Sequence, residues 1–84
     1  MMIILSEKVS FEKAEYIFDN GAEVVLFLQL GSWEYSQNPD DVDDYLCGTF
    51  EVENNAIIDW DGCFDLPEEV VLAFNHFGYD TSNI

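Results

Sequence analysis

The distribution of charge along this chain constrains its structure more than any other feature of the sequence. The only two Lys or Arg residues, Lys8 and Lys13, lie near the start, whereas all but two of the 18 Asp and Glu residues follow Lys13, and the formal net charge is −16. Because no Lys or Arg is available to neutralise these carboxylates, they repel one another at a cost in stability. The fold must therefore leave most acidic side chains in water while it buries a core.

The apolar content is sufficient for such a core. Hydrophobic residues make up 49% of the 84 residues and aromatic residues 15%, which is not the apolar-poor composition of a disordered chain. A chain of this length builds one modest core, so we expect a single domain over residues 1–84. The longest apolar runs, residues 1–5 and 24–28, are far shorter than the roughly 20 residues of a membrane-spanning helix. We therefore expect a cytoplasmic protein, in which Cys47 and Cys63 are reduced and partly buried.

The first third of the chain favours a strand, a helix and a second strand. Residues 2–5 predict a short strand, and Ser10 is placed to cap a helix over residues 11–18, whose apolar residues recur at helical spacing. The nearly continuous apolar segment at residues 22–30 is typical of a central strand covered on both faces.

The remaining segments predict an edge strand and two helices besides a hairpin. Residues 33–36 favour the edge strand, and residues 38–41 favour the start of a short helix, with an Asn cap, Pro in the first turn and acidic residues at the positive end of the helix dipole. Asp65 and Glu68 have capping-box spacing before a helix that ends at Gly78. The expected fold is α+β: a small single domain with a three- or four-stranded, mostly antiparallel sheet and two main helices packed on one face.

Asn54 and Asn55 separate two segments of alternating polarity and predict a β-hairpin, because Asn tolerates the left-handed backbone of tight turns. A three-residue loop over residues 54–56 is favoured over a two-residue loop, since it separates the two faces by polarity. One face then holds the apolar residues Phe50, Val52, Ile58 and Trp60. The other face holds Glu51, Glu53, Ile57, Asp59 and Asp61, so that four carboxylates line one open sheet face.

The sequence gives little support for an enzyme. Residues 56–63 resemble the strand-end D-x-D-G-T signature of haloacid-dehalogenase-type phosphatases, but Cys63 replaces the Thr and no Lys follows Lys13 to meet a phosphate. The spacing of Asp59, Asp61 and Gly62 does not fit an EF-hand loop. The single histidine is expected to complement a helix dipole. We therefore predict no catalytic residue, no metal site and no cofactor.

In size, charge and mixed α/β pattern, the chain resembles the DNA-mimic inhibitors encoded by phages and mobile elements. These include anti-restriction proteins, anti-CRISPR proteins and the uracil-DNA glycosylase inhibitor. The resemblance covers the whole chain, rests on composition and includes no alignable motif. It implies an anti-defence inhibitor in the host cytosol that occupies the basic groove of a nuclease, a CRISPR effector or a DNA-repair enzyme.

A groove lined by Lys and Arg is built to meet the charge density of duplex DNA, and an acidic protein face can occupy it. With only two cations, this chain is itself expected to bind neither nucleic acid nor an anionic membrane. The phosphate surrogates that the hypothesis predicts are Glu34, Asp40, Asp41, Asp43, Asp44, Glu51, Glu53, Asp59 and Asp61.

Three alternatives stay open at this point. One is an immunity protein or antitoxin that neutralises a single cognate basic nuclease. Another is a uracil-DNA glycosylase inhibitor, although the Glu-Ser-Ile strand that the resemblance implies is missing from this sequence. A weaker alternative is an acidic metal-binding or buffering protein. Formation of a homodimer that lengthens the acidic face is compatible with each of these.

Overall fold

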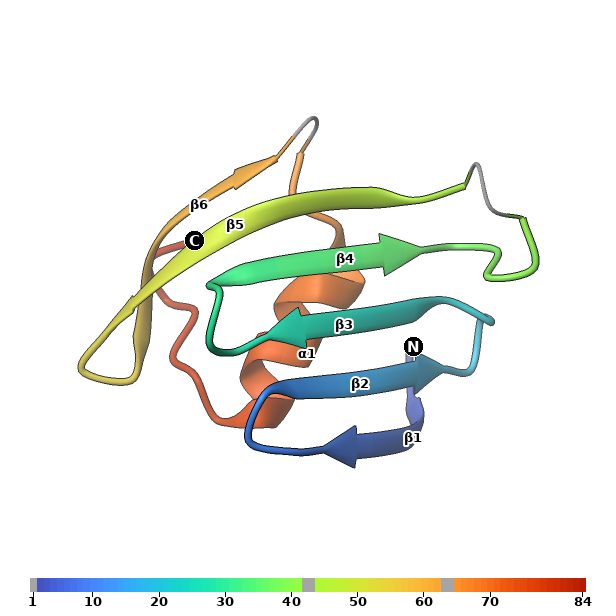
Figure 1. Ribbon diagram of the computed structural model, residues 1–84, viewed down its shortest axis with the longest axis horizontal. Coiled ribbons are helices and arrows are strands. Elements are labelled where there is room, and N and C mark those ends of the chain that lie inside the picture. The colour runs from blue at the N-terminus through green and yellow to red at the C-terminus, as the bar shows by residue number, and fades with distance from the viewer. Residues whose placement is uncertain (1, 42–43, 63–64) are drawn as a thin grey trace.

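The computed structural model describes residues 2–41, 44–62 and 65–84. The chain forms one six-stranded antiparallel sheet whose strands lie in sequence order, with one helix across one of its faces (Figure 1). The elements are β1 (Ile4–Val9), β2 (Lys13–Phe18), β3 (Glu23–Phe27), β4 (Ser32–Ser36), β5 (Leu46–Glu53), β6 (Ala56–Gly62) and α1 (Glu68–Phe77). The prediction of three or four strands and two main helices is therefore wrong: the sheet is larger, and the described residues contain a single helix.

The helix expected over residues 11–18 is in fact the strand β2. Ala14, Tyr16 and Phe18 are buried, whereas the residues between them point to the other face of the sheet, so the period of two outweighs the helical spacing. Ser10 makes the i to i+3 bond of a helix cap, since its hydroxyl oxygen accepts the Lys13 N–H at 3.2 Å. Here that bond closes the turn between β1 and β2.

β3 is central in the sheet, as expected, but only one of its faces is covered. Val24 and Leu26 are fully buried on the face that α1 covers, while Val25 and Phe27 on the opposite face stay partly exposed. The expectation that both faces are covered is wrong, because no second helix packs there among the described residues. β4 is likewise not an edge strand, since it pairs with β3 on one side and β5 on the other.

Trp33 packs into a space that two glycines leave free. Trp33 lies opposite Gly48, and Gly48 lies opposite Gly62, so the three residues form one row across β4, β5 and β6. A Cβ atom on Gly48 would lie 2.6 Å from the indole and would collide with the Asp61 carbonyl oxygen, and one on Gly62 would lie 2.8 Å from Cζ2 of the indole. The indole, which is 1% exposed, therefore requires both glycines.

The β5–β6 hairpin confirms the sequence prediction, although its loop differs. Glu53 pairs with Ala56, which leaves a two-residue turn. Asn54 and Asn55 have φ angles of 52° and 65°, as a tight type I′ turn requires. The prediction of a three-residue loop is wrong, while the tolerance of Asn for the left-handed backbone is confirmed.

A β-bulge restores the expected register farther along the hairpin. The pairing shifts between Glu51 and Val52, after which Phe50 lies opposite Trp60, as the three-residue loop also required. The extra residue thus lies within β6 instead of in the loop. In consequence Ile57 is 1% exposed and enters the core, and Ile58 is 46% exposed, the reverse of the predicted orientation.

Residues 37–45 do not form the expected short helix in the part that the structure describes. The Asp41 N–H donates to the Asn38 carbonyl oxygen at 2.9 Å, and the Asp44 N–H donates to the Asp41 carbonyl oxygen at 3.1 Å. Such isolated i to i+3 bonds are those of turns. Two residues of the predicted helix, Val42 and Asp43, lie outside the described residues.

The helix α1 lacks the predicted cap at its start but ends as predicted. Its N-cap is Pro67, and no side chain caps it, so the capping box predicted for Asp65 and Glu68 is wrong. Its end at Gly78 is confirmed, because Gly78 has a φ of 119° and donates its N–H to the last turn. The helix packs its buried side chains, Val70, Ala73 and Phe74 among them, onto the central strands.

The segment after α1 returns to the hairpin. The Ile57 N–H donates to the Asp80 carbonyl oxygen, and the Asp80 N–H donates to the Asn55 carbonyl oxygen, both at 2.9 Å. The Asn55 side-chain amide adds a bond to the Gly78 carbonyl oxygen at 2.7 Å. This segment therefore covers part of the outer edge of β6.

Candidate functional site: the open face of the sheet

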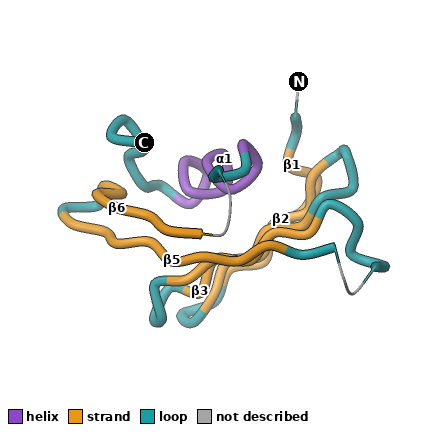
Figure 2. Tube along the Cα trace, turned by 90° about the horizontal axis from the view of Figure 1, so that it is seen from above, coloured by secondary structure: helices purple, strands orange, loops and turns teal. Residues whose placement is uncertain are grey.

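We call the sheet surface opposite α1 the open face, because no helix or strand of the described residues lies over it (Figure 2). Strand pairing places its side chains in rows. One row consists of Lys8, Glu15, Val25, Glu34 and Cys47, and another consists of Lys13, Phe27, Ser32, Thr49 and Asp61. The open face therefore mixes carboxylates with apolar and small polar side chains.

Three of the predicted phosphate surrogates lie together on the open face of the β5–β6 hairpin. Glu51 lies directly opposite Asp59, and Asp61 lies two residues farther along the same strand. Directly opposite residues are about 5 Å apart, and residues two apart on one strand are about 7 Å apart. Glu53 belongs to β5, like Glu51, but it lies beside the turn, opposite Ala56.

The two aspartates of β6 have their side chains held by the backbone. Asp59 Oδ1 accepts the N–H of Trp60 at 2.9 Å, and Asp61 Oδ1 accepts the N–H of Gly62 at 2.8 Å. Each carboxylate keeps a second oxygen for a partner. The described part of the segment that resembles a phosphatase signature is thus the edge strand β6 itself, and Cys63 lies outside the described residues.

Glu34 borders a groove on the open face, between the strands and the described residues Pro39, Asp41 and Tyr45 that follow β4. The groove has a volume of about 450 Å³ and is lined by Glu23, Val25, Glu34, Tyr35, Ser36, Pro39, Asp41 and Tyr45. The Tyr45 ring is 51% exposed. A hydrogen bond to Cys47, followed by the charges of Cys47 and Glu34, raises the pKa of the Tyr45 phenol.

The structure brings Asp41 to this groove and leaves the neighbouring acidic residues around it. Asp40 and Asp41 are exposed, and Asp44 is half-buried, its carbonyl oxygen accepting the Ser36 hydroxyl at 2.7 Å. Asp43 lies outside the described residues. The predicted site thus has two parts, the groove beside Glu34 and the carboxylates of the hairpin.

Two acidic residues of the open face, Glu15 and Glu23, are absent from the predicted site. Glu15 was assigned to a helix by the sequence interpretation, and no local signal corrects this, because only the packing of β2 against the core shows the period of two. Lys13 lies 3.5 Å from Glu15, and Lys8 lies opposite it. Both cations therefore belong to the β1–β2 end, and the open face from β3 to β6 carries acids without any Lys or Arg.

The acidic residues on the helix side serve the fold. Glu69 is buried, and its Oε2 accepts the Tyr35 hydroxyl at 2.9 Å and the Asn20 amide at 3.3 Å. Burial, followed by this bond to Glu69, raises the pKa of Tyr35 to about 12. The contact fastens the first turn of α1 to the sheet.

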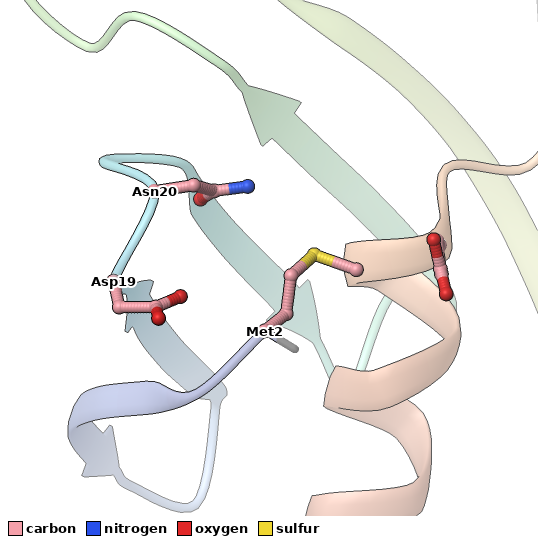
Figure 3. A pocket seen from close by; sticks show the side chains of 4 residues that line it. Met2, Asp19 and Asn20 are labelled. Atoms are coloured by element: carbon pink, nitrogen blue, oxygen red, sulfur yellow. The ribbon is translucent and has the colours of Figure 1, made fainter.

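A second cavity, of about 350 Å³, lies beside the same turn and is lined by Met2, Asp19, Asn20 and Glu68 (Figure 3). Two of its polar side chains, those of Asp19 and Asn20, are already engaged by the backbone. Asp19 Oδ1 accepts the Ile3 N–H, and Asn20 Oδ1 accepts the Ala22 N–H, both at 3.0 Å. We assign these residues to the fold.

The other chemically active side chains do not come together, because Cys47 lies on the open face and His76 lies on α1. His76 lies in the last turn of α1, as expected, with Nε2 3.0 Å from a Glu7 carboxylate oxygen. Cys47 is free and exposed, which corrects the expectation that it is partly buried, and Cys63 lies outside the described residues. In the part of the chain that the structure describes, no three His, Cys, Asp or Glu residues are arranged to hold a metal ion.

Neither the helix of the described residues nor the sequence as a whole connects this chain to a membrane-spanning helix or to a known family. Over the described residues, no helix is both long enough and apolar enough to cross a membrane. Comparison of the chain with protein-family models, curated proteins and solved structures found no match.

Proposed function

We propose that this protein is an acidic inhibitor that occupies the basic nucleic-acid-binding groove of a target enzyme, such as a nuclease, a CRISPR effector or a DNA-repair enzyme. The observation that supports this most is the alignment of Glu34, Glu51, Asp59 and Asp61 on one uncovered face. No helix of the described residues covers these carboxylates, and β3 to β6 contain no Lys or Arg that could neutralise them.

The strand backbone gives this acidic face a fixed geometry. Carboxylates about 5 to 7 Å apart on neighbouring strand positions are within reach of adjacent Lys and Arg side chains of a groove. The backbone bonds to Asp59 and Asp61 restrict their side chains before any partner arrives, which lowers the entropy lost on binding. The formal charge of −16 favours fast, salt-sensitive association with a basic protein.

The groove beside Glu34 supplies a different kind of contact. Val25, Pro39 and the exposed Tyr45 ring offer apolar surface within a rim of carboxylates. Tyr at the centre of an interface is often a strong contributor to binding energy. We therefore assign the encounter to the carboxylates and the lifetime of the complex to this groove.

Neutralising the hairpin carboxylates should weaken inhibition. The open-face variant combines Glu51→Gln, Asp59→Asn and Asp61→Asn, and the control combines Glu12→Gln, Asp65→Asn and Glu68→Gln. Both variants have the same net charge, and the three control residues are exposed acids off the open face. At about 0.5 to 1 kcal/mol for each lost charge contact, the open-face variant should inhibit roughly 10- to 100-fold less well.

The assays are release of uracil from duplex DNA by a uracil-DNA glycosylase and cleavage of duplex DNA by a restriction endonuclease and by a CRISPR effector nuclease, each with increasing inhibitor. Circular dichroism confirms that both variants stay folded. The proposal predicts a loss for the open-face variant and near wild-type inhibition for the control. Equal losses for both variants would show that net charge alone acts, and would contradict a role for the open face.

An immunity protein for one cognate nuclease is the second candidate, and the shaped groove beside Glu34 favours it. Apolar surface discriminates among partners by shape, which an even layer of charge does not do. Inhibition of several unrelated DNA-binding enzymes supports the mimic. Inhibition of one basic nuclease alone, lost on Tyr45→Ala but retained by the open-face variant, supports the immunity protein.

A further inference from the structure

The β1–β2 end of the molecule differs from the rest of its surface. Half of the large hydrophobic side chains that the described structure leaves exposed belong to it: Ile3, Leu5, Val9, Phe11 and Ile17. Leu5 is 66% exposed and Phe11 is 83% exposed. Val9 and Ile17 point to opposite faces of the sheet, so what these residues share is their position at the β1 edge.

The outer edge of β1 is also unpaired. β1 is the first strand of the sheet and, among the described residues, pairs only with β2, so one side of its backbone is open to another strand. At the other edge of the sheet, by contrast, the segment around Asp80 bonds to Ile57 of β6. An open strand edge is a template for pairing with another strand.

Charge identifies a second copy of this chain as the occupant. Lys8 lies beside Glu7 on β1, and Lys13 lies beside Glu12 at the start of β2. This end carries both signs, so a second copy meets less repulsion here. Any other surface of the chain contains acids without Lys or Arg, and two copies would repel each other there. A basic partner, in turn, is attracted to the open face from β3 to β6.

We propose that two copies associate through antiparallel pairing of their β1 edges, which extends the sheet across a two-fold axis. Such an isologous contact uses the same strand from each copy. Leu5 and Val9 lose their exposure in this dimer, and the backbone groups of the β1 edge become paired. This proposal is independent of the inhibitory function.

Sedimentation equilibrium of the full chain tests the dimer. Between about 10 µM and about 1 mM protein, the mass should rise from 9.6 kDa towards twice that value. The rise should be larger at about 0.5 M than at about 0.05 M NaCl, because salt screens the repulsion between two acidic copies. Binding to a basic enzyme has the opposite salt dependence, so the two proposals can fail separately.

A matched pair of variants locates the contact. Leu5→Glu and Leu30→Glu introduce the same charge at residues of similar exposure, but Leu30 lies in the turn between β3 and β4. Leu5→Glu should weaken dimerisation by more than about tenfold, and Leu30→Glu should dimerise like the wild type. Hydrogen exchange should also show protection of the β1 amides that increases with wild-type concentration. A wild-type chain that stays monomeric throughout, or equal behaviour of the two variants, would overturn the proposal.

Discussion

Because Trp33 packs against Gly62, we expect Gly62→Ala to destabilise the wild-type protein but to stabilise a variant with a smaller side chain at position 33. A Cβ atom at Gly62 would lie 2.8 Å from Cζ2 and 3.4 Å from Cη2 of the indole, both of which belong to its six-membered ring. Gly62 has no positive φ, so alanine fits its backbone, and the indole is the nearest obstacle. Gly62→Ala should therefore overpack the core, at a cost of about 1 to 3 kcal/mol in the free energy of unfolding.

The same substitution should behave differently beside a smaller side chain. Trp33→Phe removes both of the obstructing atoms and is itself destabilising, because it leaves a cavity. In that background Gly62→Ala fills part of the cavity. It should also stabilise the folded state by roughly 0.5 to 1 kcal/mol, because alanine within a strand is more stabilising than glycine by that amount. The two substitutions should therefore couple by about 2 kcal/mol.

Thermal and urea denaturation, followed by circular dichroism, measure this cycle in four proteins: the wild type, the two single variants and the double variant. For a domain of this size, 1 kcal/mol corresponds to about 4 to 8 °C in Tm. Gly62→Ala should lower Tm in the wild type and raise it in Trp33→Phe. Equal decreases in the two backgrounds would refute the packing of the indole over Gly62.

Two further predictions concern Glu69 and the buried tyrosines. Glu69→Ala leaves the Tyr35 hydroxyl and the Asn20 amide without their acceptor, so urea denaturation should show that the free energy of unfolding falls by about 1 to 3 kcal/mol. The control is Glu68→Ala at the exposed neighbouring residue, which should change that free energy by less than about 0.5 kcal/mol. Similar losses for the two variants would contradict the assigned role of Glu69. Burial raises the pKa of Tyr16 and Tyr35 to about 12 from 10.0, so the folded state keeps protons that the unfolded state releases, and stability should fall as pH rises from about 10 to about 12. Tyr35→Phe should make this fall of stability with pH less steep. An unchanged dependence on pH would contradict the contribution assigned to Tyr35.

Parts of the fold could be predicted from the sequence because single residues determine them. Asn54 and Asn55 indicated the hairpin and Gly78 the end of α1, since each supplies a left-handed backbone position. The period of the apolar residues in β2 was ambiguous, because Phe11, Ala14, Ile17 and Phe18 also match a helix. Only the packing of Ala14, Tyr16 and Phe18 against the rest of the core decides between the two.

The candidate site was predictable to the extent that it depends on the hairpin. Opposition of Glu51 and Asp59 was expected, and it holds because the bulge in β6 compensates for the shorter turn. The bulge itself depends on burying Ile57 beside the segment that carries Asp80, a long-range contact without a local signal. The groove beside Glu34 also depends on such a contact, since Pro39, Asp41 and Tyr45 line it from outside the sheet.

Competition with DNA tests the central claim most directly. For an enzyme that the protein inhibits, the apparent inhibition constant is measured as the concentration of duplex DNA substrate increases. If the open face occupies the nucleic-acid-binding groove, inhibition should be competitive, and it should weaken with added salt. An inhibition constant that does not change with DNA concentration would show that protein and DNA bind at separate places, and would contradict the account.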